Sequence, residues 1–205
     1  MKQLAAVCLF AFAAQAQFTP EQEKALEADI VPKLAELALV APRLLTNNLE
    51  RYAYTNLDYA MTIGIARTPK GRLWNCWVAG EDGPRAYFVL NHSDDNGLTW
   101  SDPALVIDMH QNSPIPRSTL IGNLWTAPDG TLHLFLNQSM LQFDGRSGDW
   151  VTVCADPDAD HPTWTRPRRI WHGHTLNKPT LLSDGSWLLP VSLNQRTSGG
   201  YAGMG

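Results

Sequence analysis

The octet Ser93-Asp94-Asp95-Asn96-Gly97-Leu98-Thr99-Trp100 carries the strongest structural signal in this chain of 205 residues. It fits the pattern S-x-D-x-G-x-T-W at all five specified positions. Ser93 and Asp95 can bond turn amides, and Gly97 can take a positive φ. Trp100 can cover the turn. The octet therefore predicts a tight connection between two antiparallel strands, and nothing in it indicates catalysis.

Three further turns share a sequence pattern and recur at similar intervals. Each lies between two short apolar runs, as expected for the hairpin that joins strands one and two of a four-stranded unit. Their glycines are separated by 59 and 55 residues. The turns are Thr68-Pro69-Lys70-Gly71, Ala127-Pro128-Asp129-Gly130 and Leu182-Ser183-Asp184-Gly185. A second marker, Trp100-Ser101-Asp102-Pro103, recurs as Trp164-Thr165-Arg166-Pro167, where strands three and four would meet.

These features resemble the sialidase superfamily, in which such an octet is called the Asp-box and whose members are β-propellers with about four strands per blade. The similarity covers residues 55–205 and implies an all-β fold. The implied architecture is a sialidase-like β-propeller that is six-bladed when complete, preceded here by a short helix. Blade 1 would cover about residues 57–110, blade 2 about 117–172 and blade 3 about 174–205.

The number of blades in this sequence follows from its length. Six blades of about 60 residues need about 350 residues. We therefore expect the N-terminal part of a longer protein, with about two and a half blades. These blades should start near Met61, Ile121 and Lys178.

The octet of the second blade has decayed. It spans Pro157–Trp164, with Ala159 in place of the Asp and His161 in place of the Gly. This second turn must close by other contacts, for which Asp158 and Asp160 are the candidates.

Residues 1–16 have the features of a secretory signal peptide: Lys2, an apolar run over residues 4–14 and a small-residue cleavage site at Ala14-Gln15-Ala16. Cleavage before Gln17 would release a secreted or periplasmic protein. The apolar run is shorter than the about 20 residues that cross a bilayer, so no membrane span is expected.

Residues 17–56 are predicted to form an N-terminal helical segment and linker. Thr19 can cap a helix that has Pro20 at its first position, and Pro32 should kink or end it. Apolar residues recur there at helical spacing: Leu26, Ile30, Leu34 and Leu37.

The composition provides enough apolar residues for a core, since 44% are hydrophobic and eight are Trp. The net charge is −4, without a run of Lys or Arg, which excludes a nucleic-acid partner. Cys76 and Cys154 lie in strand-like apolar runs, which favours buried unpaired thiols, although an oxidising compartment permits pairing. No cofactor is implied. His172-Gly173-His174 lacks a third ligand at a spacing that would indicate a metal site.

Alternating strand direction divides the connections between two faces. The turns between strands one and two and between strands three and four lie on one face, which carries the octet. Candidate site residues belong on the opposite face, in the approach to each first strand and in each loop between strands two and three.

In blade 1 the loop on that face contains Glu81, Asp82 and Arg85. A carboxylic acid near a sugar can serve as general acid, so Glu81 and Asp82 are catalytic candidates. Arg85 can bind a substrate carboxylate with two parallel hydrogen bonds. The alternative is a solvated charge cluster with a local ion pair.

In blade 2 the candidate substrate-binding residues are Arg117, Asn123 and Gln138. Arg117 follows a segment without a strand pattern, which suits either a binding loop or an ordinary solvated charge. Gln138 ends an apolar strand, which suits either a contact with a sugar hydroxyl or a satisfied strand end.

Blade 3 opens with the densest polar group in the chain. His172 and His174, next to Trp171, could supply a proton donor and a stacking platform for a sugar ring. The alternative is that both His side chains bond loop carbonyls. The residues expected to bind an acidic substrate are Asn177, Lys178, Gln195 and Arg196.

The resemblance implies a secreted carbohydrate-active enzyme that cleaves a glycosidic bond at an acidic sugar, as an exo-sialidase-like glycoside hydrolase. Its partner would be an acidic oligosaccharide or glycoconjugate. The family's Arg-Ile-Pro motif is absent, since Tyr59-Ala60-Met61-Thr62-Ile63 contains no Arg. The family's Tyr nucleophile and its Glu partner would lie beyond residue 205. Two alternatives stay open: a polysaccharide lyase or rhamnosidase-like enzyme that uses His172 or His174, and a propeller that binds glycans or proteins without catalysis.

Overall fold

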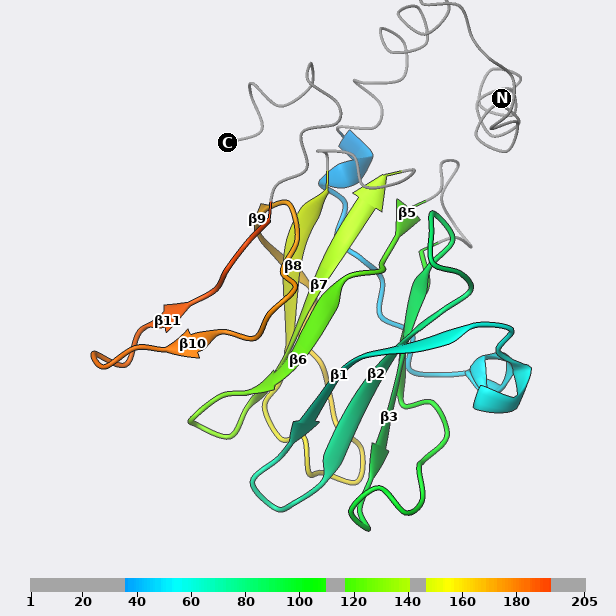
Figure 1. Ribbon diagram of the computed structural model, residues 1–205. Helices are drawn as coiled ribbons and strands as arrows, with labels where there is room; N and C mark the ends of the chain where they lie inside the picture. Colours follow the sequence, from blue (N-terminus) through cyan, green and yellow to red (C-terminus); the bar gives the residue numbers. More distant parts are fainter. Residues whose placement is uncertain (1–35, 110–116, 141–146, 193–205) are drawn as a thin grey trace, which may run out of the picture.

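Antiparallel strands form nearly all the regular structure of the computed structural model, which describes residues 36–109, 117–140 and 147–192 (Figure 1). The all-β prediction is confirmed at this level. Helix is limited in the described part to residues 36–38 and two short 3-10 helices, η1 (Glu50–Tyr52) and η2 (Tyr54–Asn56). The predicted signal peptide and the helix start at Thr19 lie outside the described residues.

The first sheet is a four-stranded antiparallel meander in chain order. Its strands are β1 (Ala60–Arg67), β2 (Leu73–Ala79), β3 (Tyr87–Ser93) and β4 (Leu105–Ile107). β3 ends at Ser93, the first residue of the octet, and β4 follows the octet. The octet therefore joins strands three and four, as its sequence predicts.

The second sheet repeats this meander and adds one short strand. Its strands are β5 (Arg117–Ser118), β6 (Gly122–Thr126), β7 (Leu132–Met140), β8 (Gly148–Cys154) and β9 (Arg168–His172). β6 to β9 pair in chain order. β5 pairs with the last residues of β7, past the point where the first residue of β6, Gly122, pairs with Leu136.

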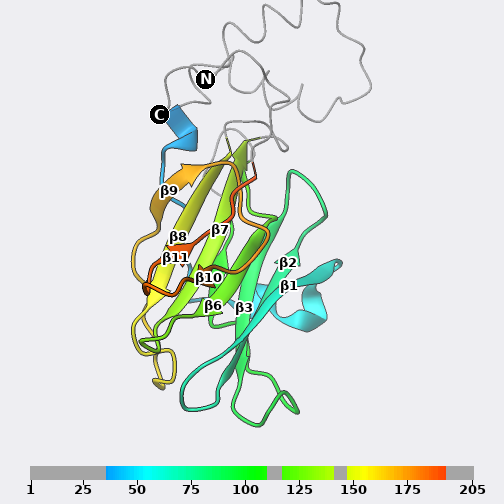
Figure 2. The ribbon, with the colours of Figure 1, turned by 60° about the vertical axis from the view of Figure 1, so that its left-hand side comes forward.

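A hairpin of β10 (Thr180–Leu181) and β11 (Trp187–Leu188) follows. It projects beside β6 to β9 (Figures 1 and 2). The Trp187 ring meets the Trp125 ring edge to face, with centroids 4.5 Å apart. The three units begin at Ala60, Gly122 and Thr180, within two residues of the predicted starts. In the described residues they do not close into a ring.

The core lies between the two large sheets. Alternate residues of β2, including Trp74 and Cys76, point into it and are fully buried. Leu124 and Leu134 of the second sheet belong to the same apolar cluster. Each such side chain stabilises the fold by about 1.5–3 kcal/mol relative to an exposed position.

The first strands of the two meanders, β1 and β6, lie side by side (Figures 1 and 2). Gly64 of β1 sits at their closest approach, because a Cβ atom there would lie 3.0 Å from the backbone N of Leu124. Glycine thus permits this packing.

The outer face of the first sheet is covered by residues 44–57. Leu45 exchanges two backbone hydrogen bonds with Val106 of β4, at 2.8 and 2.9 Å. The Tyr52 ring packs against Tyr87 at 5.5 Å, and its hydroxyl donates to Asp108 Oδ2 at 2.7 Å. The segment predicted as a linker therefore packs on the sheet in its described part.

Cys76 and Cys154 are buried free thiols. Burial raises the pKa of Cys76 well above its ordinary value and that of Cys154 to about 11. Both thiols therefore stay protonated at neutral pH and act as small hydrophobes.

The connections divide between opposite edges of the sheets, as strand alternation predicts. The turns 68–72, 94–104, 127–131 and 155–167 lie at the lower edge in Figure 1. The loop 80–86 and the approaches to β6 and β10 belong to the other edge, which we call the candidate edge. The lower edge is called the turn edge.

Candidate functional site

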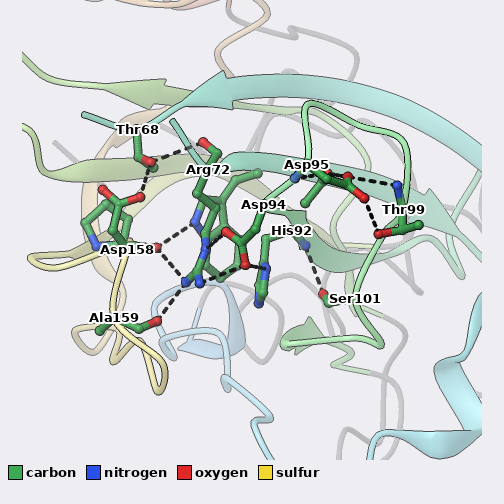
Figure 3. Close-up of polar contacts among 12 residues, drawn as sticks. Thr68, Arg72, His92, Asp94, Asp95, Thr99, Ser101, Asp158 and Ala159 are labelled. Atoms are coloured by element: carbon green, nitrogen blue, oxygen red, sulfur yellow. Dashed lines mark hydrogen bonds and ion pairs between the residues drawn. The ribbon is translucent and has the colours of Figure 1, made fainter. Parts of the chain in front are cut away.

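The octet closes its turn through Ser93 and Asp95. The amide of Gly97 donates to Ser93 Oγ at 2.8 Å, and Ser93 Oγ donates to Asp95 Oδ1 at 2.7 Å. Thr99 donates to the two Asp95 oxygens, from its amide at 2.9 Å and its hydroxyl at 2.6 Å (Figure 3). Asn96 and Gly97 have φ values of 63° and 87°. The side chains of the pattern therefore bond the turn itself.

Asp95 is held as a carboxylate. The hydrogen bond from the Thr99 hydroxyl, with further bonds from the Thr99 amide and Ser93, lowers the pKa of Asp95 to about 2. Such a group accepts hydrogen bonds at neutral pH and has no proton to donate. The octet is a structural element of the turn edge.

Arg72 joins the two sheets at the turn edge, a role with no signal in the sequence. Its Nε and Nη2 donate to the two carboxylate oxygens of Asp94, at 2.7 and 3.1 Å. Its Nη1 donates to the carbonyl oxygens of Pro157 and Ala159 in the second turn, at 3.2 and 2.7 Å (Figure 3). The Arg72 side chain is 9% exposed. All three nitrogens of this buried guanidinium thus donate hydrogen bonds, and those of Nη1 link the first sheet to the second.

Asp158 also crosses between the sheets. It accepts a hydrogen bond from the Thr68 hydroxyl and another from the Lys70 amide at 3.2 Å. Asp158, a candidate for holding the decayed turn, thus anchors that turn to the β1–β2 hairpin of the first sheet rather than by bonds within the turn.

At the candidate edge, Glu81 and Arg85 form a local ion pair. Arg85 Nη2 lies 2.7 Å from Glu81 Oε2, and the Arg85 amide donates to Glu81 Oε1 at 2.9 Å. Hydrogen bonding to Glu81 raises the pKa of Arg85. The Arg85 side chain is 59% exposed, and Asp82 is exposed beside it. The geometry matches the ion-pair alternative while leaving Asp82 and Arg85 accessible.

Arg117 and Gln138 are buried together. Arg117 Nη1 donates to Gln138 Oε1 and to the carbonyl of Val40, both at 3.3 Å. Gln138 Nε2 donates to the carbonyls of Ala38 and Val40, at 3.0 and 3.1 Å. Burial lowers the pKa of Arg117. These two predicted substrate-binding residues therefore hold the chain at the end of the helix 36–38, whose last carbonyls need donors.

Asn123 and Lys178 tie the approach to β10 to the first strands of the two meanders, β6 and β1. Asn123 Nδ2 donates to the carbonyl of Leu176 at 2.7 Å, and Lys178 Nζ donates to the carbonyl of Ile65 at 2.8 Å. Burial lowers the pKa of Lys178. Asn177, between these contacts, is exposed. Of these predicted binding residues, Asn177 alone has an exposed side chain without a hydrogen bond in the described residues.

His172 lies at the end of β9 beside an exposed aromatic ring. The Trp171 ring is 58% exposed, and its centroid lies 5.7 Å from that of His172. His172 Nδ1 is 3.1 Å from Arg169 Nη2. Because a guanidinium only donates, Nδ1 accepts and the neutral ring carries its proton on Nε2. Burial and then Arg169 lower the pKa of His172. His172 is therefore a neutral hydrogen-bond donor.

His174 is buried and belongs to the interior. Its backbone exchanges hydrogen bonds with Ser192 at 3.0 and 2.9 Å. Burial lowers the pKa of its ring. Gln195 and Arg196 lie outside the described residues.

Asp149, at the start of β8, is a perturbed carboxyl group that the sequence analysis missed. It is fully buried, and burial raises its pKa to about 7. The Thr175 hydroxyl lies 2.9 Å from Asp149 Oδ2 and 3.0 Å from the carbonyl of Pro190. One hydroxyl proton cannot serve both acceptors. A protonated Asp149 that donates to Thr175 satisfies both contacts, which agrees with the raised pKa. A carboxylate at the head of an apolar strand is the signal that could have identified it.

At the candidate edge one backbone hydrogen bond joins the two sheets, and another extends the β8–β9 pairing of the second sheet. The Thr119 amide donates to the carbonyl of Ala86 at 3.0 Å, and the Gly173 amide donates to the carbonyl of Ser147 at 2.8 Å. The first bond links the loop that contains Glu81 to the segment before β6. The second links the segment between β9 and β10 to the residue before β8.

The described residues contain no group of three or more His, Cys, Asp and Glu side chains that could share a metal ion. In the same part of the chain, no helix has the length and apolar content to cross a membrane. No protein-family model and no curated protein matches this sequence.

Proposed function

We propose that the chain forms the first units of a sialidase-like β-propeller in a secreted enzyme that acts on acidic glycans. The observation that carries the proposal is the octet. Its five pattern positions lie in the turn between strands three and four of a four-stranded antiparallel meander, and Ser93, Asp95 and Thr99 bond that turn.

The packing of successive units supports the propeller. A second meander packs on the first, its inner strand β6 lies beside β1, and a third hairpin follows at a similar interval. Apolar side chains of that hairpin are exposed in the described residues, including Trp187 and Leu188 at 42% and 58%. In a propeller the neighbouring strands cover such a face.

The chemistry we propose uses the accessible groups of the candidate edge. Asp82 protonates the glycosidic oxygen as its bond to the anomeric carbon breaks, and a water molecule adds to that carbon, its released proton restoring Asp82. Arg85 exchanges its bond with Glu81 for a bidentate bond to the acidic substituent of the sugar. Trp171 stacks on a sugar ring, and Nε2 of His172 donates to a sugar oxygen.

The tautomer of His172 favours this assignment over the lyase or rhamnosidase-like alternative. A catalytic base needs an unprotonated nitrogen that faces the substrate. The contact with Arg169 occupies Nδ1 and leaves the proton on Nε2. His172 therefore suits substrate binding better than proton abstraction.

The test is an assay of the complete secreted protein on sialosides and on uronic-acid oligosaccharides. Release of free sialic acid supports the proposal. Unsaturated uronic-acid products would instead identify a lyase, and binding of glycans without turnover would identify a binding propeller. Either of these results contradicts the proposed hydrolase.

Variants locate the chemistry. We expect Asp82→Asn to lower kcat about 10²–10⁴-fold, the usual contribution of a general acid. Asp129→Asn removes an exposed carboxylate of the 127–131 turn, at the turn edge, and serves as the matched control. Full activity in Asp82→Asn and in Glu81→Gln, together with complete loss in His172→Asn, would overturn the carboxylate assignment.

A further inference from the structure

A polar cleft lies at the turn edge between the two large sheets. Its volume is about 590 Å³, within the range of about 300–1,000 Å³ typical of small-molecule sites. Three segments form it: residues 46–47 before η1, residues 101–104 after the octet and residues 160–164 of the second turn. The cleft is therefore built from both sheets and from the N-terminal segment.

The walls of the cleft are fixed by hydrogen bonds. The Ser101 amide donates to the carbonyl of His92 at 2.8 Å, and the His92 amide donates to Ser101 Oγ at 3.0 Å (Figure 3). In the second turn, the backbone of Trp164 forms an isolated β-bridge with Cys154. The Trp164 ring contacts the Trp74 ring edge to face, with centroids 5.6 Å apart. A ligand would thus meet preorganised walls.

The lining combines an apolar surface with exposed polar groups. Trp164 and Pro103, both partly buried, contribute the apolar rings of the lining. Asp102, after the octet, and Asp160, in the second turn, both line the cleft, and both are exposed. Neither carboxylate side chain makes a hydrogen bond to another described residue. Both carboxylates are thus able to accept hydrogen bonds from a ligand.

The charge of the cleft selects the kind of ligand. Among the described residues that line it there is no Lys or Arg, while Asp102 and Asp160 each carry a carboxylate. Burial and then Arg72 lower the pKa of His92, so this ring adds no charge at neutral pH. An anionic ligand would meet the like charge of these two carboxylates.

We propose that this cleft binds a neutral sugar unit, as a second glycan site apart from the candidate edge. The hydroxyl groups of a sugar donate to Asp102 and Asp160, and its apolar face packs on Trp164. Hydrogen bonds to charged acceptors are strong enough to position a ligand that carries no charge. The site does not depend on the hydrolase activity proposed above.

The experiment measures binding of tetrasaccharides to the full chain by calorimetry and by saturation-transfer NMR. The neutral probes are cellotetraose, xylotetraose and β-1,4-galactotetraose, and the acidic probe is tetragalacturonate. We expect at least one neutral probe to bind. Asp160→Ala and Asp102→Ala should each weaken that binding about tenfold, the effect of losing one charge-assisted hydrogen bond.

Two controls make the result specific. Asp58→Ala removes an exposed carboxylate outside the cleft and should leave binding unchanged. Asp82→Asn should also leave it unchanged, which separates this cleft from the candidate edge. Binding of tetragalacturonate alone, absence of binding by all three neutral probes, or unchanged affinity in both Asp102→Ala and Asp160→Ala would overturn the proposal.

Discussion

At the scale of the residue, two carboxyl groups show how surroundings decide protonation. Asp95 accepts three hydrogen bonds in its turn, from Ser93 and from two donors of Thr99. Asp149 is enclosed in the second sheet, next to Thr175. Hydrogen bonds favour the charged form of the first, and burial favours the neutral form of the second. The two pKa values accordingly move in opposite directions.

Replacing Asp95 should loosen the first turn. We expect Asp95→Ala to lower Tm by about 2–5 °C at neutral pH, because the turn loses its side-chain acceptor. The pKa of Asp95 is lower in the folded state than in the unfolded state. Its carboxylate therefore stabilises the fold at pH values above the pKa of the unfolded state. This stabilisation is lost as the pH falls toward about 2. Thermal melts between neutral and acidic pH measure this difference, with Asp58→Ala as control. Equal melting temperatures for wild type and Asp95→Ala at neutral pH would refute it.

Asp149 should make stability depend on pH in the other direction. Its folded pKa of about 7 lies above the ordinary value of 3.8, so its neutral form stabilises the fold at low pH. The free energy of unfolding should fall by at most about 4 kcal/mol as the pH rises from about 4 to about 8. Asp149→Asn imitates the protonated group and should not show this fall.

Urea denaturation of wild type and Asp149→Asn across that pH range measures the difference. Groups other than Asp149 affect both proteins equally, so the difference between the two curves isolates this carboxyl. Parallel curves would show that Asp149 is charged in the folded protein at neutral pH.

At the scale of the element, the β1–β2 hairpin and the second turn hold the two sheets in register. Arg72 bonds the carbonyls of Pro157 and Ala159, and Asp158 bonds Thr68 and the Lys70 amide. The contacts are reciprocal, since each sheet supplies one charged group to the other. The decayed octet therefore gains its order from the neighbouring sheet.

Arg72→Lys tests this crosslink. One ammonium cannot reproduce the bidentate bond to Asp94 and also reach two carbonyls, so buried acceptors lose their donor. We expect a loss of about 2–3 kcal/mol in the free energy of unfolding. Arg67→Lys is the matched control, because the exposed Arg67 uses only Nη1, for Asn96 and Gly71, and should change stability by less than about 0.5 kcal/mol. Equal effects of the two substitutions would contradict the crosslink.

Features encoded within a few residues could be predicted from the sequence. Gly71, Gly97, Gly130 and Gly185 all have positive φ, and each lies in a turn that its neighbours indicate. The alternation of β2 likewise places Trp74 and Cys76 on one buried face.

Contacts between distant segments could not be predicted. Gln138 ends an apolar strand, as expected, but its partners are Ala38 and Val40, about a hundred positions away in the chain. The partners of Arg72 and the burial of Asp149 also depend on how separate elements pack. Sequence periodicity indicates which face of a strand is buried. It does not indicate which residues of other elements pack against that face.

At the scale of the whole molecule, the two meanders and the third hairpin follow one another along the chain, and the first strands of the two meanders, β1 and β6, are adjacent. The hairpin β10–β11 leaves Leu181, Trp187 and Leu188 exposed in the described residues. Radial repetition of the same unit would cover this face and bring the candidate-edge loops around one pocket.

The most direct test is a crystal structure of the full-length protein. The rotation that superposes β1–β4 on β6–β9 should share its axis with the rotation that superposes β6–β9 on the unit begun by β10 and β11. Each rotation should be about 60°, as six blades require. Rotations about unrelated axes, or a third unit that is not a four-stranded meander, would contradict the proposed propeller.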